Sequence, residues 1–261
     1  MSEGRTLAFK VVIPARLGST RLPRKVLRDI AGKPVIHRVW EAAQCAGAEQ
    51  VVIATDSEEV RDVCAGFGAD VQMTSVQHQS GTDRANEVAG VRNWDASAIV
   101  VNLQGDEPLM PPALVRQAAH LLADDADAHI ASLCHAIHDV EEWLNPNIVK
   151  LVMDQRDYAL YFSRAPIPWK RDGATRAAPL LPQGQAFRHI GLYAYRVAAL
   201  AEFSALPMAA LEDCEALEQL RALSHGFRIK MGVIEQAPPR GIDTEEDLQA
   251  VIALLTRGDS R

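Results

Sequence analysis

Short apolar segments alternate with amphipathic segments along the first half of the chain. The apolar segments lack polar alternation, which predicts strands that are buried on both faces of a parallel sheet. The segments between them space apolar residues as a helix with one buried face does, and Ser57 is typical of a helix N-cap. The predicted strands are residues 9–14, 51–54, 71–74 and 98–103, and the helices are residues 35–46, 81–94, 112–123 and one from Ser57 to about Gly66. This alternation predicts a doubly wound α/β fold.

The pattern changes after about residue 128, where predicted strands follow one another with few helices between them. We therefore expect the sheet to become mixed in this part of the chain. Residues 170–185 are rich in Gly, Ala, Pro and charge without any periodicity, which predicts an irregular loop. No internal repeat or linker divides the chain, so residues 1–261 are expected to form one domain. The predicted strands here are residues 129–138, 148–154, 158–163 and 188–195, and the closing helices are residues 209–224 and 244–255.

Composition narrows the classes of protein to which this chain can belong. The 261 residues are 48% apolar, which is ample for a folded core. A balance of 27 basic and 34 acidic side chains gives a net charge of −7, which argues against a general nucleic-acid binder. The four cysteines are too far apart for a redox or zinc pair, and neither a signal peptide nor a membrane-spanning segment is evident. We expect a cytoplasmic protein without a membrane partner.

The loop after the first predicted strand has the composition of a phosphate-binding site. It places Arg16, Arg21, Arg24 and Lys25 around Gly18, with the hydroxyls of two further residues nearby. Glycine permits close backbone approach, hydroxyls and amides donate hydrogen bonds, and the cations neutralise phosphate charge. The hydroxyl residues are Ser19 and Thr20. The loop differs from a Walker A sequence because Pro23 stands in place of the second glycine, so P-loop chemistry is disfavoured.

Two aspartates are candidate ligands for a magnesium ion. Asp106 follows the predicted strand at residues 98–103, and ligands of open parallel sheets bind outside the carboxyl ends of the strands. Asp243 stands just before a helix that Thr244 and Asp247 are expected to cap, which leaves its own carboxylate free. Mg²⁺ usually takes one or two carboxylates together with phosphate oxygens. If the two loops meet in the fold, these aspartates form a metal site.

Several motifs together resemble the 3-deoxy-manno-octulosonate cytidylyltransferase family, which makes CMP-Kdo. The likeness covers nearly the whole chain, and its most specific parts are residues 78–84, 159–164 and 188–191. The other matching segments are residues 16–25, 32–36, 54–56, 104–108 and 241–244. The resemblance implies a doubly wound, Rossmann-like nucleotidyltransferase fold with a mainly parallel mixed sheet. It also implies an antiparallel, β-rich region at about residues 130–195 that serves dimerisation and sugar binding.

The resemblance also implies the reaction, its cofactor and its site. The anomeric hydroxyl of 3-deoxy-D-manno-octulosonate (Kdo) attacks the α-phosphate of CTP and pyrophosphate leaves, and the reaction requires Mg²⁺. Members of the family are homodimers, and the reaction serves lipopolysaccharide biosynthesis. Arg16, Lys25, Asp106 and Asp243 would be catalytic, with the two aspartates on Mg²⁺. Nucleotide binding would involve Arg16, Gly18, Ser19, Thr20, Lys25, Ser80, Gly81, Arg84 and Gln104. Sugar binding would involve Arg164, His189, Tyr193, Glu218 and Gln219.

Two alternatives remain open from the sequence. A cytidylyltransferase for another sugar acid, such as 8-amino-Kdo or sialic acid, would share the phosphate-binding loop. A non-catalytic nucleotide sensor on the same fold belongs to a different class of protein. The presence of both Asp106 and Asp243 argues against the sensor, because a sensor needs no catalytic metal.

Overall fold

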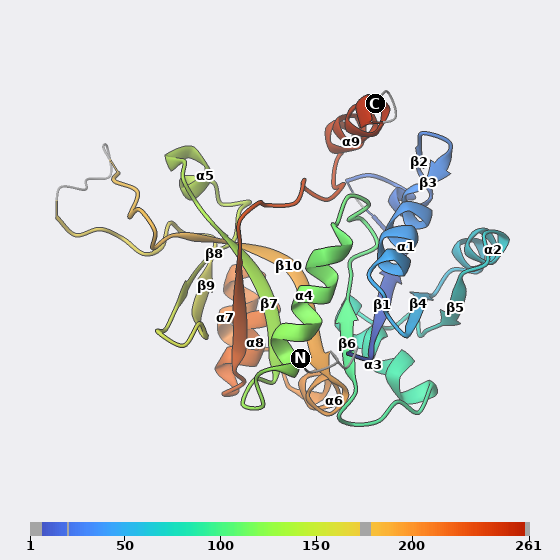
Figure 1. Ribbon diagram of the computed structural model, residues 1–261, viewed down its shortest axis with the longest axis horizontal. Helices are drawn as coiled ribbons and strands as arrows, with labels where there is room; N and C mark the ends of the chain where they lie inside the picture. Colours follow the sequence, from blue (N-terminus) through green and yellow to red (C-terminus); the bar gives the residue numbers. More distant parts are fainter. Residues whose placement is uncertain (1–6, 20, 173–178, 259–261) are drawn as a thin grey trace, which may run out of the picture.

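A mixed sheet runs through the molecule and carries helices on both of its faces (Figure 1). The computed structural model describes residues 7–19, 21–172 and 179–258. Within these ranges the sheet has nine strands, and seven of them lie in the order β11-β7-β10-β6-β1-β4-β5. The doubly wound α/β prediction with a mainly parallel, mixed sheet is confirmed.

The parallel part of the sheet is built from the apolar segments of the first half of the chain. Strand β1 (Phe9–Ala15) pairs in parallel with β4 (Gln50–Thr55) on one side and with β6 (Ile99–Asn102) on the other. Strand β5 (Asp70–Met73) extends this part beyond β4. All three central strands are largely buried because helices cover both of their faces. Their carboxyl ends therefore open onto one edge of the sheet.

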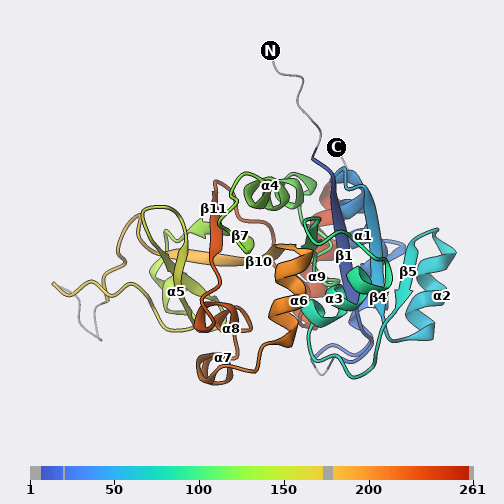
Figure 2. The same ribbon diagram turned by 90° about the horizontal axis from the view of Figure 1, so that it is seen from below.

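Two apolar cores lie on the opposite faces of the sheet. One core receives side chains from α1 (Val35–Cys45), α2 (Glu58–Gly66) and α4 (Pro112–Ala123). The other receives side chains from α3 (Gly81–Val91) and α6 (Val197–Ala205), and Figure 2 shows α4 and α6 on opposite sides of the sheet. None of the helices in the described ranges has the length and apolar character needed to cross a membrane.

The second half of the chain extends the sheet with strands of both directions. Strand β10 (Phe187–Arg196) runs antiparallel to both of its neighbours, β6 and β7 (Ile130–Ala136), so it is a reversed strand between strands of one direction. Strands β8 (Lys150–Met153) and β9 (Ala159–Ser163) form an antiparallel pair beside the end of β10. These strands agree with the predicted change of pattern after residue 128. The predicted loop at residues 170–185 contains no helix or strand where it is described, and residues 173–178 lie outside the described ranges.

Strand β11 (Ile229–Ile234) was not predicted, because Lys230 and Gly232 interrupt its apolar pattern. It pairs in parallel with β7. A Cβ atom at Gly232 would lie 2.9 Å from the Leu133 side chain, so the glycine allows the close packing of this edge strand.

The predicted helix at residues 209–224 is two short helices. Helix α7 (Ala210–Glu215) ends where Ala216 adopts the left-handed conformation, with a φ of 50°, and α8 (Gln219–Ser224) follows. The predicted N-caps of α2 and α9 (Glu245–Gly258) are confirmed, since Ser57 and Thr244 accept from Val60 N and Asp247 N, respectively. The remaining elements are η1 (Lys25–Leu27), β2 (Asp29–Ile30), β3 (Lys33–Pro34) and α5 (Val140–Leu144).

Candidate active site

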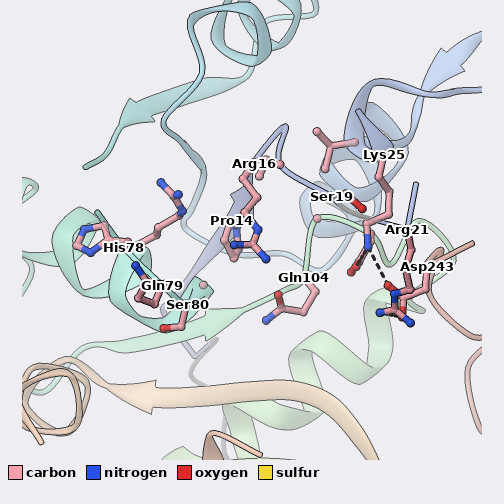
Figure 3. Close-up of a pocket in the computed structure, with 17 residues that line it drawn as sticks. Pro14, Arg16, Ser19, Arg21, Lys25, His78, Gln79, Ser80, Gln104 and Asp243 are labelled. Atoms are coloured by element: carbon pink, nitrogen blue, oxygen red, sulfur yellow. Dashed lines mark hydrogen bonds and ion pairs between the residues drawn. The ribbon is translucent and has the colours of Figure 1, made fainter. Parts of the chain in front are cut away.

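A cavity of about 630 Å³ opens at the carboxyl ends of β1 and β6 and at the N-terminus of α3 (Figure 3). It lies where the fold places the loops that follow parallel strands, which is where such sheets bind ligands. The structure brings ten of the residues predicted for catalysis and nucleotide binding to this cavity; Thr20 lies outside the described residues. The ten are Arg16, Gly18, Ser19, Lys25, Ser80, Gly81, Arg84, Gln104, Asp106 and Asp243.

Lys25 joins the two aspartates that the sequence places far apart. Its ammonium group lies 2.6 Å from Asp106 Oδ2 and 3.0 Å from Asp243 Oδ1. Arg21 adds a second cation, 3.1 Å from the other oxygen of Asp243. Burial lowers the pKa of Lys25, but the two carboxylates more than offset that effect, so its pKa is raised and it stays protonated. The two loops thus meet, and their carboxylates converge on the ammonium group of Lys25.

Close backbone contacts hold the two aspartate loops together. A Cβ atom at Gly105 would lie 2.6 Å from the carbonyl oxygen of Pro14, so only glycine lets this loop pass so near the end of β1. The backbone N–H of Ile242 donates to Asp106 O at 2.8 Å. Asp247 accepts from the backbone N–H groups of Asp243 and Thr244, which fixes the start of α9. These contacts determine where both carboxylates lie.

The N-terminus of α3 forms the opposite wall of the cavity. Ser80 caps the helix through a capping box with Asp83, and the next residue, Gly81, packs directly on the Pro14 ring. Arg84 is 3% exposed, and its guanidinium donates to Asp56 at 2.6 Å and to Thr74 at 2.8 Å. These contacts make the helix end a rigid wall of the cavity, and helix N-termini favour polar or anionic ligands.

His78 and Gln79 also line the cavity; the sequence placed them in a family motif, residues 78–84, but assigned them no role. His78 is held by Glu87, whose carboxylate lies 2.5 Å from the imidazole Nε2. Their position directly before the Ser80 helix cap could have indicated that His78 and Gln79 lie at the site. Arg24 differs from the other cations of the predicted phosphate loop, because its guanidinium pairs with Glu59 and it is absent from the cavity lining among the described residues.

A second cavity of about 430 Å³ adjoins the first and shares Arg21, Asp106 and Asp243 with it. His189 lines it, together with Arg188 and Glu107, two residues that lie in the matching segments but were assigned no role from the sequence. Burial, reinforced by the neighbouring Asp106 charge, raises the pKa of Glu107 to about 8. The two aspartates therefore stand at the junction of two polar cavities.

The other predicted sugar residues lie beside the cavities rather than in their lining. Glu218 accepts from Thr82 Oγ1 at 2.7 Å, next to the Ser80 cap, and Gln219 is the buried first residue of α8. The ring of Tyr193 lies 5.2 Å from that of His189. Burial lowers the pKa of His189 to about 3, so this imidazole is neutral at physiological pH.

Arg164, one of the predicted sugar-binding residues, is directed to backbone carbonyls in this structure. It donates to Glu215 O at 2.7 Å, to Pro146 O at 3.1 Å and to Ala216 O at 3.4 Å. Through these bonds it holds the turn between α7 and α8, two residues before Glu218.

The pair of aspartates suits a cation that completes its coordination with ligand oxygens. Within the described residues there is no cluster of three or more His, Cys, Asp or Glu side chains of the kind that encloses a metal. Asp106 and Asp243 instead converge on one ammonium group, and both are partly exposed to the first cavity. Two partly exposed carboxylates beside the predicted phosphate-binding loop fit Mg²⁺.

Comparisons with known proteins agree with this geometry. The family described as Cytidylyltransferase matches residues 10–230. A solved structure described as CMP:2-keto-3-deoxy-manno-octonic acid synthetase complexed with CTP superposes with a TM-score of 0.87 and 41% identity, covering 97% of this chain and 100% of that one.

Curated relatives share about half of their residues with this chain, and each is named 3-deoxy-manno-octulosonate cytidylyltransferase. The protein of Marinobacter nauticus is 51% identical over 98% of this chain and 100% of its own length. That of Thioalkalivibrio sulfidiphilus is 52% identical over 95% and 99%, and that of Pseudomonas fluorescens is 51% identical over 95% and 98%.

Proposed function

This chain belongs to the 3-deoxy-manno-octulosonate cytidylyltransferase family, and we propose that it performs the reaction of that family at the junction of its two cavities. It transfers CMP from CTP to the anomeric hydroxyl of Kdo and releases pyrophosphate. The observation that carries the proposal is the meeting of Lys25, Asp106 and Asp243 in a cavity lined by the phosphate-binding loop. Neither a nucleotide sensor nor a different sugar acid is favoured by these observations.

The first cavity binds the nucleotide. Arg16, Ser19 and Lys25 stand along one side and bind the triphosphate, because cations and hydroxyls match its charge and its oxygens. Ser80 and Gly81 offer the N-terminal end of α3, and Gln104 supplies an amide from the end of β6, so the base and ribose lie against this wall. Figure 3 shows Arg16, Ser80, Gln104 and Lys25 arranged around the cavity.

Asp106 and Asp243 would hold Mg²⁺. When bound there, the ion supplies positive charge to the phosphate oxygens on which negative charge builds up. Lys25, fixed by both aspartates, adds a permanent positive charge beside the same oxygens. Arg21 and Arg16 approach from the cavity side and stabilise the departing pyrophosphate. The chain thus acts mainly by positioning and charge stabilisation, as phosphoryl and nucleotidyl transfers require.

The sugar acid binds beside the α-phosphate, between the cavity wall and the side chains of β10. His189 lines the second cavity, and Tyr193 and Glu218 continue this polar surface toward Ser80. The neutral His189 imidazole and the Tyr193 hydroxyl provide uncharged hydrogen-bonding groups for hydroxyls of the sugar. Arg164 supports Glu218 and Gln219 by holding the preceding turn.

A crossed pyrophosphate-release assay tests the activity. The purified chain is incubated with Mg²⁺, one of four nucleoside triphosphates, and Kdo, 8-amino-Kdo or sialic acid. We expect rapid release only with CTP and Kdo. Preference for another sugar acid would change the substrate, whereas CTP binding without turnover for any sugar would leave only the sensor. Omission of Mg²⁺ from the CTP and Kdo reaction is expected to abolish release.

We also propose that the chain forms a homodimer through its β-rich region at residues 130–195. Exposed large apolar side chains of this region support the assignment, because burial of apolar surface in a dimer interface is favourable. They are Leu144, Leu160, Trp169 and Leu180, each more than 40% exposed. Light scattering of the wild type and of Leu160→Arg measures whether the dimer forms and whether it depends on this region.

We further propose that the protein works in the reducing cytoplasm. Its four cysteines are free, as is usual for proteins of that compartment.

A further inference from the structure

Asn102, the last residue of β6, carries a buried side-chain amide that has no hydrogen-bond partner. The residue is 1% exposed, and among the described residues neither its Nδ2 nor its Oδ1 makes a hydrogen bond. An amide that is both buried and unpaired is costly, and native structures hold few of them. Such a group is a candidate binding group where it lies next to a ligand cavity.

The amide lies on the face of the sheet that α3 covers. Val100, two residues earlier on β6, belongs to the core beneath α3 and α6, and strand alternation places Asn102 on the same face. Leu103 continues the ladder through its N–H to Val12 O. Gln104, two residues beyond Asn102, lines the first cavity and lies close to Gly81 at the start of α3. Asn102 thus lies on the same strand face as the cavity-lining residue Gln104, two residues before it in the sequence.

Two predicted sugar residues border the same place. Tyr193 on β10 is paired directly with Asn102 across the antiparallel ladder, so the two side chains lie next to each other on one face. Glu218, whose charge acts on Tyr193, has one oxygen bonded to Thr82 and the other, Oε1, buried without a partner. Two buried polar groups without a hydrogen-bond partner therefore lie near Tyr193.

We propose that Asn102 is a specificity-determining residue of the sugar subsite, whose amide donates a hydrogen bond to one hydroxyl of the sugar acid and accepts another from it. A hydroxyl is at once donor and acceptor, so it satisfies the amide nitrogen and oxygen together, and Glu218 Oε1 accepts from a neighbouring hydroxyl. The hydroxyl reaches the buried amide after a rotamer change of side chains at the cavity wall, a change that is common on binding. This inference rests on the proposed function.

The chemistry gives a site that discriminates between sugars. Sites built to hydrogen-bond a hydroxyl reject analogues that lack it, because the polar groups of the protein are then left unpaired. Asn102 would therefore favour polyhydroxylated sugar acids over deoxygenated ones. The amide is unpaired in the free protein, so its removal is expected to affect sugar binding without weakening the fold.

Asn102→Leu tests this prediction, because leucine has nearly the shape of asparagine without its polar atoms. We expect the KM for Kdo to rise roughly 10- to 100-fold, the KM for CTP to stay within about twofold, and the unfolding midpoint to stay equal or rise. Trp40→Phe is the matched control: Trp40 Nε1 is also buried and unpaired, but it packs on the other core. Both KM values should be unchanged in this control.

The possible outcomes separate this inference from the proposed function. If the wild type makes no CMP-Kdo, the proposed function fails. If the wild type is active and Asn102→Leu keeps the wild-type KM for Kdo, the specificity role is overturned. A fall in the unfolding midpoint without a change in that KM shows a structural role instead. Should Asn102→Leu not fold, Asn102→Ser must still raise the KM for Kdo selectively, and its failure to do so refutes the inference.

Discussion

The close approach of Gly105 to the end of β1 determines where the Asp106 carboxylate lies. A Cβ atom at this position would stand 2.6 Å from Pro14 O and 3.6 Å from the Ile36 side chain. The Pro14 oxygen belongs to the backbone of a central strand, so it cannot rotate away. In Gly105→Ala the loop itself must move, and Asp106, the next residue, moves with it away from Lys25.

The size of the effect follows from these distances. Real Cβ atoms essentially never approach within 3.0 Å of another atom, so the loop must shift by at least about 0.4 Å. A misplacement of about 1 Å costs roughly a hundredfold in rate, so we expect kcat to fall about 10- to 100-fold. Overpacking of this kind also lowers the free energy of unfolding by about 1–3 kcal/mol.

Pyrophosphate release at saturating CTP and Kdo, well below the unfolding temperature, measures the kcat of Gly105→Ala. A Mg²⁺ titration of the same variant should show weaker binding of the metal, seen as a higher half-saturating Mg²⁺ concentration. Gly90→Ala in α3 is the matched control, since a Cβ atom there meets nothing within 4 Å. Wild-type kcat and unfolding temperature in Gly105→Ala would refute the argument that this contact positions Asp106.

Two further predictions concern the nucleotide and the pH dependence of stability. Arg16→Ala should weaken CTP binding about 10- to 100-fold in calorimetry through loss of a charge-assisted contact, whereas Arg24→Ala, whose cation pairs with Glu59, should leave it unchanged. The folded pKa of His189, about 3, lies below the unfolded value of about 6.5, so the unfolded chain takes up its proton first as the pH falls. Denaturant unfolding should therefore show that wild type loses more stability from pH 7.5 to pH 5 than His189→Gln, and equal losses would contradict the shift.

The fold was predictable where apolar segments are long and continuous. Strands β1, β4 and β6 follow from this pattern because they are buried on both faces. Strand β11 was not predictable, since Gly232 is there for close packing on Leu133 rather than for a local propensity. The break at Ala216 was also hidden, because its left-handed backbone conformation accompanies contacts with Arg164, far away in the sequence.

The site was predictable as far as strand ends and charge reveal it. Lys25 and Asp106 follow strands whose carboxyl ends share an edge of the sheet, so their meeting follows from parallel topology. The approach of Asp243 depends on a backbone contact between Ile242 and Asp106, which no local pattern encodes. The second cavity, which Arg188 lines, was not predictable for the same reason, because the tertiary fold brings its lining residues together from distant segments.

The central claim is that the carboxylates of Asp106 and Asp243, fixed by Lys25, provide the cation site for nucleotidyl transfer. The most direct measurement is pyrophosphate release by Asp106→Asn across a range of Mg²⁺ concentrations, with its unfolding midpoint measured alongside. The account predicts a loss of roughly a thousandfold or more that added Mg²⁺ does not restore, in a variant that unfolds as the wild type does. Near-normal release of pyrophosphate by this variant would contradict it.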